Sequence, residues 1–208
     1  MLNMIAGSVL PITAFIGVFF AFAATCILTS FLNDWLPRDM GREFAHNGKL
    51  SAGKPRGAGL IFILAFGIVA MLFGKFNWEI LIYLVLTIAS MLTGYLDDAS
   101  KNPWGEFKKG ALDLLIACLV ARTYLAFNGS EIFINILGES IVLNPIVFFI
   151  LAVILVWVSI NVTNCTDGVD GLSGTLSVIT LFTIYLLESV KGTNSAINYI
   201  TLILIVCV

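Results

Sequence analysis

The sequence predicts an all-α polytopic membrane protein, and three features of its 208 residues support that fold class. Hydrophobic residues make up 59% of the chain, charged residues only 12%, and the mean hydropathy is +1.01. A soluble domain usually carries about 25% charged residues. The apolar residues also gather in seven runs, and a membrane helix needs about 20 such residues. Because the net charge is −2, no binding to nucleic acid is expected.

The seven apolar runs, taken in order, are the expected transmembrane helices of one domain over residues 1–208. They cover residues 6–32, 57–73, 80–96, 111–127, 145–160, 172–187 and 196–208. The connection between the fourth and fifth runs carries alternating apolar residues. The last run stops at Val208 without a cap or a turn signal, so we expect an N-terminal portion of a longer protein.

Basic residues indicate which side of the membrane each connection faces, because short cytoplasmic loops are enriched in Lys and Arg. Eight of the 11 basic residues lie in two connections, residues 33–56 and 97–110. The sequence therefore predicts that these connections, together with residues 161–171, face the cytoplasm. The N-terminus is expected outside.

Two adjacent acids, Asp97 and Asp98, end the third apolar run, and Lys101 follows them. Adjacent helix positions do not face each other, whereas positions three or four apart do. If the helix continues past Leu96, the two carboxylates diverge while Lys101 lies within one turn of both. One carboxylate would then be free to meet a metal ion and the other a reacting group. The alternative is a solvated helix end.

A second polar cluster links the fifth and sixth runs. Its amides and carboxylates, Asn161, Asn164, Asp167 and Asp170, cannot lie in lipid and must line water or a ligand. Oxygen ligands of this kind suit Mg²⁺, which takes one or two carboxylates and leaves its other positions to water and substrate phosphates. The alternative is a polar turn in which Asp167 caps the next helix.

A third segment, Lys54-Pro55-Arg56-Gly57-Ala58-Gly59, is a stiff basic turn that opens the second run through small residues. Such a turn suits an anionic ligand held against the backbone. Positive-inside topology explains the same bases without a function.

Together the three segments resemble the polyprenyl-phosphate N-acetylhexosamine-1-phosphate transferase superfamily, and within it the phospho-MurNAc-pentapeptide transferase branch. The family has an Asp-Asp pair after its third span, an Asn-x-x-Asn-x-x-Asp-Gly-x-Asp-Gly-Leu loop after its fifth, and a Pro- and Gly-containing turn before its second. Here these are Asp97-Asp98, Asn161 to Leu172, and Gly53 to Gly59. The family turn usually carries Thr where this chain has Lys54 and Arg56.

The resemblance implies Mg²⁺-dependent transfer of phospho-MurNAc-pentapeptide from UDP-MurNAc-pentapeptide to undecaprenyl phosphate, giving lipid I and UMP at the cytoplasmic face of the bacterial inner membrane. Both a direct displacement and an acyl-phosphate intermediate on an Asp are compatible with it. The expected partners are the two substrates and membrane lipid, with a homodimer as one open assembly. The family's later Asp motif and histidine-rich loop are missing from residues 1–208.

Each implied role falls on a residue that matches the family pattern or the basic turn. Catalytic roles fall on Asp97, Asp98, Asp167 and Lys101, with Asp97 accepting or orienting the proton of the lipid phosphate and Lys101 holding a phosphate. Metal binding falls on Asn164, Asp98 and Asp167, and substrate binding falls on Asn161, Gly168, Asp170, Lys54 and Arg56, with Gly168 and Asp170 at the uridine.

Two other functions are alternatives to this transfer. A sister transferase would move GlcNAc-1-phosphate to a polyprenyl phosphate with the same metal and lipid chemistry. A cation-coupled transporter would need acids at mid-depth in its spans, whereas the four motif acids lie at span ends. A CDP-alcohol phosphotransferase is excluded, because its Arg after the Gly and its downstream acids do not follow Gly168.

Overall fold

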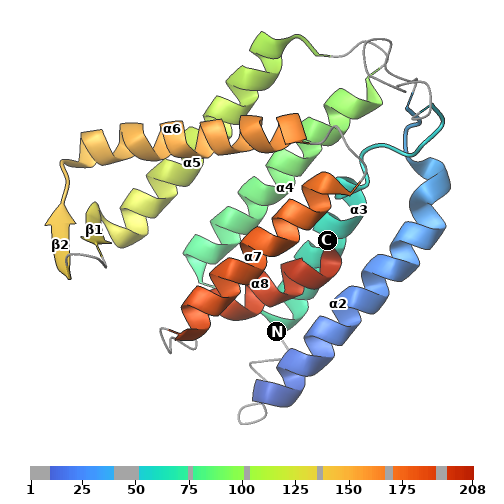
Figure 1. The fold of residues 1–208 in the computed structure, drawn as a ribbon, viewed down its shortest axis with the longest axis horizontal. Helices are drawn as coiled ribbons and strands as arrows, with labels where there is room; N and C mark the ends of the chain where they lie inside the picture. The colour runs from blue at the N-terminus through green and yellow to red at the C-terminus, as the bar shows by residue number, and fades with distance from the viewer. Residues whose placement is uncertain are drawn as a thin grey trace. The chain divides into compact units, whose positions relative to one another are not determined.

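A computed structural model describes residues 10–39, 52–74, 77–100, 104–134, 138–166, 171–190 and 196–208. Helices form in all seven predicted segments: α2 (Leu10–Leu32), α3 (Gly59–Phe73), α4 (Trp78–Ala99), α5 (Glu106–Asn128), α6 (Pro145–Thr166), α7 (Leu172–Val190) and α8 (Ala196–Cys207) (Figure 1). A 3-10 turn, η1 (Asn33–Trp35), follows α2. The strands β1 (Glu131–Ile134) and β2 (Glu139–Val142) pair antiparallel between α5 and α6. The all-α polytopic fold class is confirmed.

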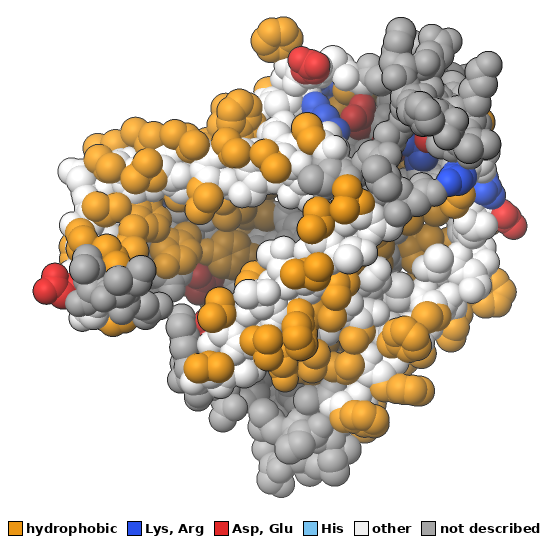
Figure 2. Space-filling view, in the orientation of Figure 1, with side chains coloured by type: hydrophobic (Ala, Val, Ile, Leu, Met, Phe, Trp, Pro, Cys, Tyr) orange, Lys and Arg blue, Asp and Glu red, His pale blue; other side chains and the backbone are white. Residues whose placement is uncertain are grey.

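The helices differ in length, and not all of them are long enough to cross a membrane. Five of those described are long and apolar enough to span one, whereas α3 and the described part of α8 are shorter. Large apolar side chains on the long helices are exposed, among them Phe15 at 73% and Leu155 at 68%. Figure 2 shows hydrophobic side chains spread over the sides of helices on the face that it draws. Apolar surface of this extent suits lipid rather than water.

The first of two compact units comprises residues 1–76, 91–103 and 174–208. Its helices α2, α3 and α8 pack against one another in pairs. Residues buried on these helices include Ala21, Ile61, Val69 and Ile203, none of them more than 2% exposed. A Cβ atom added at Gly17 of α2 would collide with the Tyr199 hydroxyl of α8, so a larger residue at this position would require the Tyr199 side chain to move.

The second unit comprises residues 77–90 and 104–173. Here α5 packs against α6, with Ala117, Ala121 and Val153 at the centre of the contact and Phe149 and Val156 beside them. Small residues let two membrane helices approach closely. The start of α5 therefore lies beside the end of α6, which places both in one cluster of polar side chains.

Two helix ends bear on the predicted site. The α4 helix continues past Leu96 to Ala99, which is the condition on which the divergence of Asp97 and Asp98 depended. The α6 helix continues to Thr166, so Asn161 and Asn164 lie on helical turns and not in the expected loop. Asn161 Nδ2 donates to the Trp157 carbonyl at 2.8 Å, one turn back, which satisfies an amide inside the helix.

Candidate active site

A short antiparallel stem carries the two bases predicted to bind an anion. Three backbone hydrogen bonds of 2.8 Å join residues 37–39 to residues 53–56: Asp39 N to Lys54 O, Gly53 N to Asp39 O, and Arg56 N to Pro37 O. Arg38 and Pro55 form the bridge between the two segments. The stem therefore holds Lys54 and Arg56 at defined positions just before α3.

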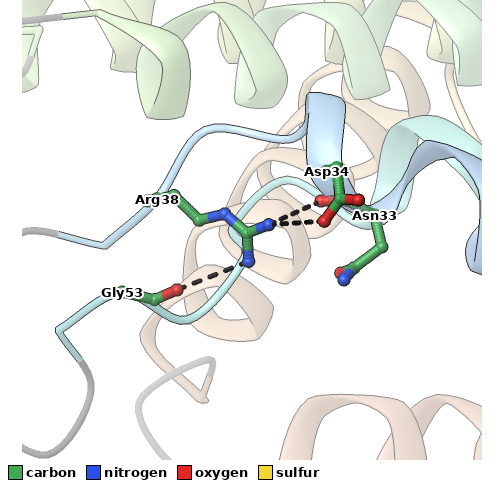
Figure 3. Close-up of polar contacts among 4 residues, drawn as sticks. All are labelled: Asn33, Asp34, Arg38 and Gly53. Atoms are coloured by element: carbon green, nitrogen blue, oxygen red, sulfur yellow. Dashed lines mark hydrogen bonds and ion pairs between the residues drawn. The ribbon is translucent and has the colours of Figure 1, made fainter.

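Arg38 ties this stem to η1 (Figure 3). Its guanidinium donates to the Asn33 carbonyl at 3.3 Å, to Asp34 Oδ1 at 3.1 Å and to the Gly53 carbonyl at 3.4 Å. Exposed ion pairs typically contribute only about 0.2–1 kcal/mol, and the Asp34 side chain is 88% exposed. The contribution of Arg38 is therefore geometric, because one planar group fixes three segments at once.

The stem meets the end of α4 through an ion pair. Arg56 donates to Asp98 Oδ1 at 2.9 Å, across 42 positions of sequence, and the two side chains are 42% and 30% exposed. Asp97 is partly buried. Adjacent residues project about 100° apart around a helix of 3.6 residues per turn. The structure thus brings Arg56 together with one acid of the predicted pair, while the other faces a different direction.

Gly57 allows the stem to lie against α4. Its φ is +71°, a left-handed conformation that favours glycine, and a Cβ at this position would lie 2.9 Å from the Tyr95 ring. Gly53 also has a positive φ, +85°, but a Cβ there would meet no atom within 4 Å. The left-handed backbone favours glycine at both positions. Only at Gly57 is there also no room for a side chain.

The second unit builds a separate polar cluster at the start of α5 and the end of α6. Lys109 Nζ donates to Asn164 Oδ1 at 3.1 Å, and Trp157 Nε1 donates to the Gly110 carbonyl at 3.0 Å. Both bonds cross from one helix to the other. They hold Asn164, a predicted metal ligand, beside an ammonium group that the sequence reasoning did not assign to the site.

Each unit, taken by itself, offers oxygen donors of the kind that Mg²⁺ prefers. Asp97 and Asp98 offer carboxylate oxygens and Asn164 offers an amide oxygen, all hard ligands. The described part of the chain contains no group of three or more His, Cys, Asp or Glu side chains that could hold a metal ion. An ion that takes only one or two protein carboxylates and completes its shell with substrate phosphates does not need such a group. Lys101, Asp167, Gly168 and Asp170 lie outside the described residues.

Two residues of α5 were not among the predicted site residues, and one of them contacts the predicted ligand Asn164. The charge of Lys109 indicates a cytoplasmic connection, yet the residue lies on α5 and contacts Asn164. Asp113 lies on the same helix and is 3% exposed. An acid inside an apolar membrane helix is costly and is by default a functional candidate, so its position within the run 111–127 was the signal that could have identified it.

Comparison with known proteins agrees with these features. The model of a family described as glycosyl transferase family 4 matches residues 80–208. This chain belongs to that family. Two curated relatives, phospho-N-acetylmuramoyl-pentapeptide-transferases from two strains of Treponema pallidum, one of them strain Nichols, are each 40% identical to this chain over 134 residues. The matched stretch covers 63% of this family 4 chain and 37% of the length of each relative.

The family 4 match includes the acids at the end of α4 and the whole polar cluster of α5 and α6. The stem with Lys54 and Arg56 precedes residue 80, where the match begins. The contact between Arg56 and Asp98 therefore joins a segment before the match to an acid within it.

Proposed function

We propose that this chain is part of an enzyme that transfers phospho-MurNAc-pentapeptide from UDP-MurNAc-pentapeptide to undecaprenyl phosphate, giving lipid I and UMP. The observation that carries the proposal is the 40% identity to two relatives named for this transfer. The carboxylates at the end of α4 and the cation and amide at the ends of α5 and α6 support it, because phosphoryl transfer depends chiefly on positioning and charge neutralisation. The proposed location is the cytoplasmic face of the bacterial inner membrane.

In the proposed reaction, an oxygen of the lipid phosphate attacks the phosphorus attached to the sugar. The bond from that phosphorus to the bridging oxygen breaks, and UMP leaves with the electron pair. The new bond completes a lipid-linked diphosphate. A proton carried by the lipid phosphate passes to the Asp97 carboxylate, which diverges from Asp98 around the end of α4.

The remaining residues hold charge in place. Asp98, Asn164 and Asp167 would hold Mg²⁺, which when bound supplies positive charge to the diphosphate. Arg56 and Lys54 receive phosphate oxygens from the stem, and Lys101 holds a further phosphate. Asn161, Gly168 and Asp170 complete the binding of the nucleotide sugar. Arg56 exchanges its carboxylate partner for a phosphate oxygen, because an exposed ion pair is weak enough to be replaced.

The proposal is tested by turnover with defined substrates. Purified full-length protein is mixed with undecaprenyl phosphate and Mg²⁺, and then with either UDP-MurNAc-pentapeptide or UDP-GlcNAc, and release of UMP is measured. The expected result is UMP from the muramoyl substrate. UMP from UDP-GlcNAc alone would assign the protein to the sister transferase, and UMP from neither substrate would overturn the transfer.

The side of the membrane is tested with a native thiol. Cys165 follows Asn164 directly and is exposed. In sealed inverted membrane vesicles, whose outer surface is the cytoplasmic one, a membrane-impermeant maleimide should label Cys165. Labelling only in right-side-out vesicles would contradict the cytoplasmic placement of the site.

A further inference from the structure

Asp113 is a buried acid in the second unit to which no role has yet been given. It is the eighth residue of α5 and only 3% exposed. A charged side chain within a membrane helix is expensive, and such residues usually face other polar groups in the protein interior. A buried carboxylate at this position therefore calls for a nearby polar or positively charged group that stabilises it.

The packing of α5 places Asp113 in line with the helix contact. Ala117 and Ala121 follow it at four-residue spacing and are 0% and 1% exposed, packed with Val153 of α6. Residues four apart lie on one helix face, one above the other. Lys109 precedes Asp113 by the same interval. The buried stripe of α5 thus continues through Asp113 to Lys109, whose ammonium contacts Asn164.

Charge and helical spacing point to Lys109 as the cation for this acid. The described residues of the second unit include three basic side chains, Lys108, Lys109 and Arg122. Lys108 Nζ lies 3.6 Å from the centroid of the Trp104 ring. Arg122 is exposed and lies nine residues further along, a rise of about 13 Å. Of these three, only Lys109 shares the face of Asp113 at a spacing of one turn.

Helix stability does not explain a lysine at this position. Lys109 is the fourth residue of α5, and the positive end of a helix dipole disfavours cations. A lysine that precedes its acid by four positions is also the less favourable order for such a pair. A cation retained near the start of a helix, in spite of the helix dipole, instead suits a ligand with negative charge.

We propose that Asp113 is a positioning residue for Lys109. Its buried carboxylate holds the Lys109 ammonium beside Asn164, so that the ammonium meets the diphosphate of the nucleotide sugar where α5 starts and α6 ends. This inference rests on the proposed function for its ligand. It adds a pair of residues, Lys109 and Asp113, to those implied by the resemblance.

A double-mutant cycle tests the pair through ligand binding. The dissociation constant of UDP-MurNAc-pentapeptide is measured with full-length protein and without undecaprenyl phosphate, so that no turnover occurs. We expect Asp113→Asn and Lys109→Met each to weaken binding about tenfold, and the double variant to bind as Lys109→Met does. Glu106→Gln, which neutralises an exposed acid at the start of the same helix, is the matched control and should bind as the wild type does.

Equal loss of affinity from Asp113→Asn with and without Lys109 would overturn the proposal, as would no loss in the wild-type background. A purely structural acid gives the additive result, because its loss does not act through the ammonium.

A second cycle, measured as thermal unfolding without ligand, separates the pair from the proposed function. Asp113→Asn leaves an ammonium without its buried counter-charge, so removal of both charges should recover part of the lost unfolding temperature. This check holds even where the single variant folds poorly. Absence of recovery would overturn the pair. Wild-type protein that binds no UDP-MurNAc-pentapeptide would overturn the proposed function, and with it the ligand named here, even where the two residues remain coupled in unfolding.

Discussion

Arg56 in the first unit and Lys109 in the second are both cations near helix ends, but they are held in different ways. In the first unit, Arg56 comes from a loop stem and meets the charged oxygen of Asp98 at 2.9 Å. In the second, Lys109 comes from a helix and meets the neutral amide oxygen of Asn164 at 3.1 Å. Backbone hydrogen bonds position the first cation, and helix packing positions the second.

The difference shows which of the two contacts can rearrange. The ion pair of Arg56 and Asp98 is partly exposed, so its net stabilisation is about 0.2–1 kcal/mol and a ligand can replace it. The contact of Lys109 and Asn164 is itself exposed, but it lies at the end of a helix pair whose buried centre at Ala117, Ala121 and Val153 resists deformation. We therefore expect the stem to adjust when a ligand binds, and the helix pair to keep its geometry.

The largest effect should come from the acid adjacent to that ion pair. Asp97→Asn removes a carboxylate that the proposed reaction uses to accept a proton, and such groups contribute about 10²- to 10⁴-fold to rate. UMP release should fall by that factor while membrane insertion stays intact. Asp34→Asn, which neutralises an exposed acid of the same unit, should change the rate less than about twofold. Equal rates in Asp97→Asn and wild type would reject the role of Asp97.

The next effect tests how the stem is placed. Gly57→Ala forces an L residue into a left-handed conformation, at about 1–2 kcal/mol, and sets a methyl group against the Tyr95 ring. We expect activity to fall about 10- to 100-fold, because small misplacements of a positioning group have effects of that size.

Gly53→Ala is the matched control for that variant. It has the same conformational cost at φ +85° but meets no atom within 4 Å. Its unfolding free energy should fall by a similar amount while activity changes less than about threefold, since the contact with α4 is untouched. Equal losses of activity in the two variants would mean that the contact with Tyr95 does not position Arg56.

A smaller effect is expected from Arg56→Gln. Loss of this charge should raise the KM for the nucleotide sugar about 3- to 10-fold, because a charged hydrogen bond is worth about 1.5–3 kcal/mol and part of that survives with an amide. The unfolding free energy should change by less than about 1 kcal/mol. A large loss of stability without a change in KM would make the ion pair structural and remove the contrast between the two units.

Much of the fold could be predicted because a membrane helix needs little more than an apolar run. All seven runs became helices, and the alternation around Ile132 and Ile141 became the strands β1 and β2. Helix ends were harder to predict. Polar residues after Ile160 indicated a loop, yet α6 continues through Asn161 and Asn164, because side-chain bonds to the preceding turn and to Lys109 satisfy those amides.

The residues of the candidate site could be predicted in part, whereas the contacts between them could not. Asp97, Asp98 and Asn164 could be selected from residue type and spacing, because acids and amides at span ends are uncommon and chemically specific. The pairing of Arg56 with Asp98 could not be predicted, since it joins positions 42 apart through a stem whose register depends on backbone bonds. Lys109 was overlooked because topology alone explained its charge.

The smallest predicted effect concerns the packed helix pair of the second unit. Trp157→Phe removes the hydrogen bond from Trp157 Nε1 to the Gly110 carbonyl but keeps an aromatic ring in place. The unfolding free energy in detergent should fall by about 0.5–1.5 kcal/mol, and UMP release should stay within about twofold, because helix packing and the bond from Lys109 to Asn164 remain. Trp78→Phe, at an exposed Trp of the same unit, controls for loss of an indole. Were Trp157→Phe to reduce turnover more than Gly57→Ala does, turnover would be more sensitive to small displacements in the helix pair than in the stem, and the contrast drawn between the two contacts would be reversed.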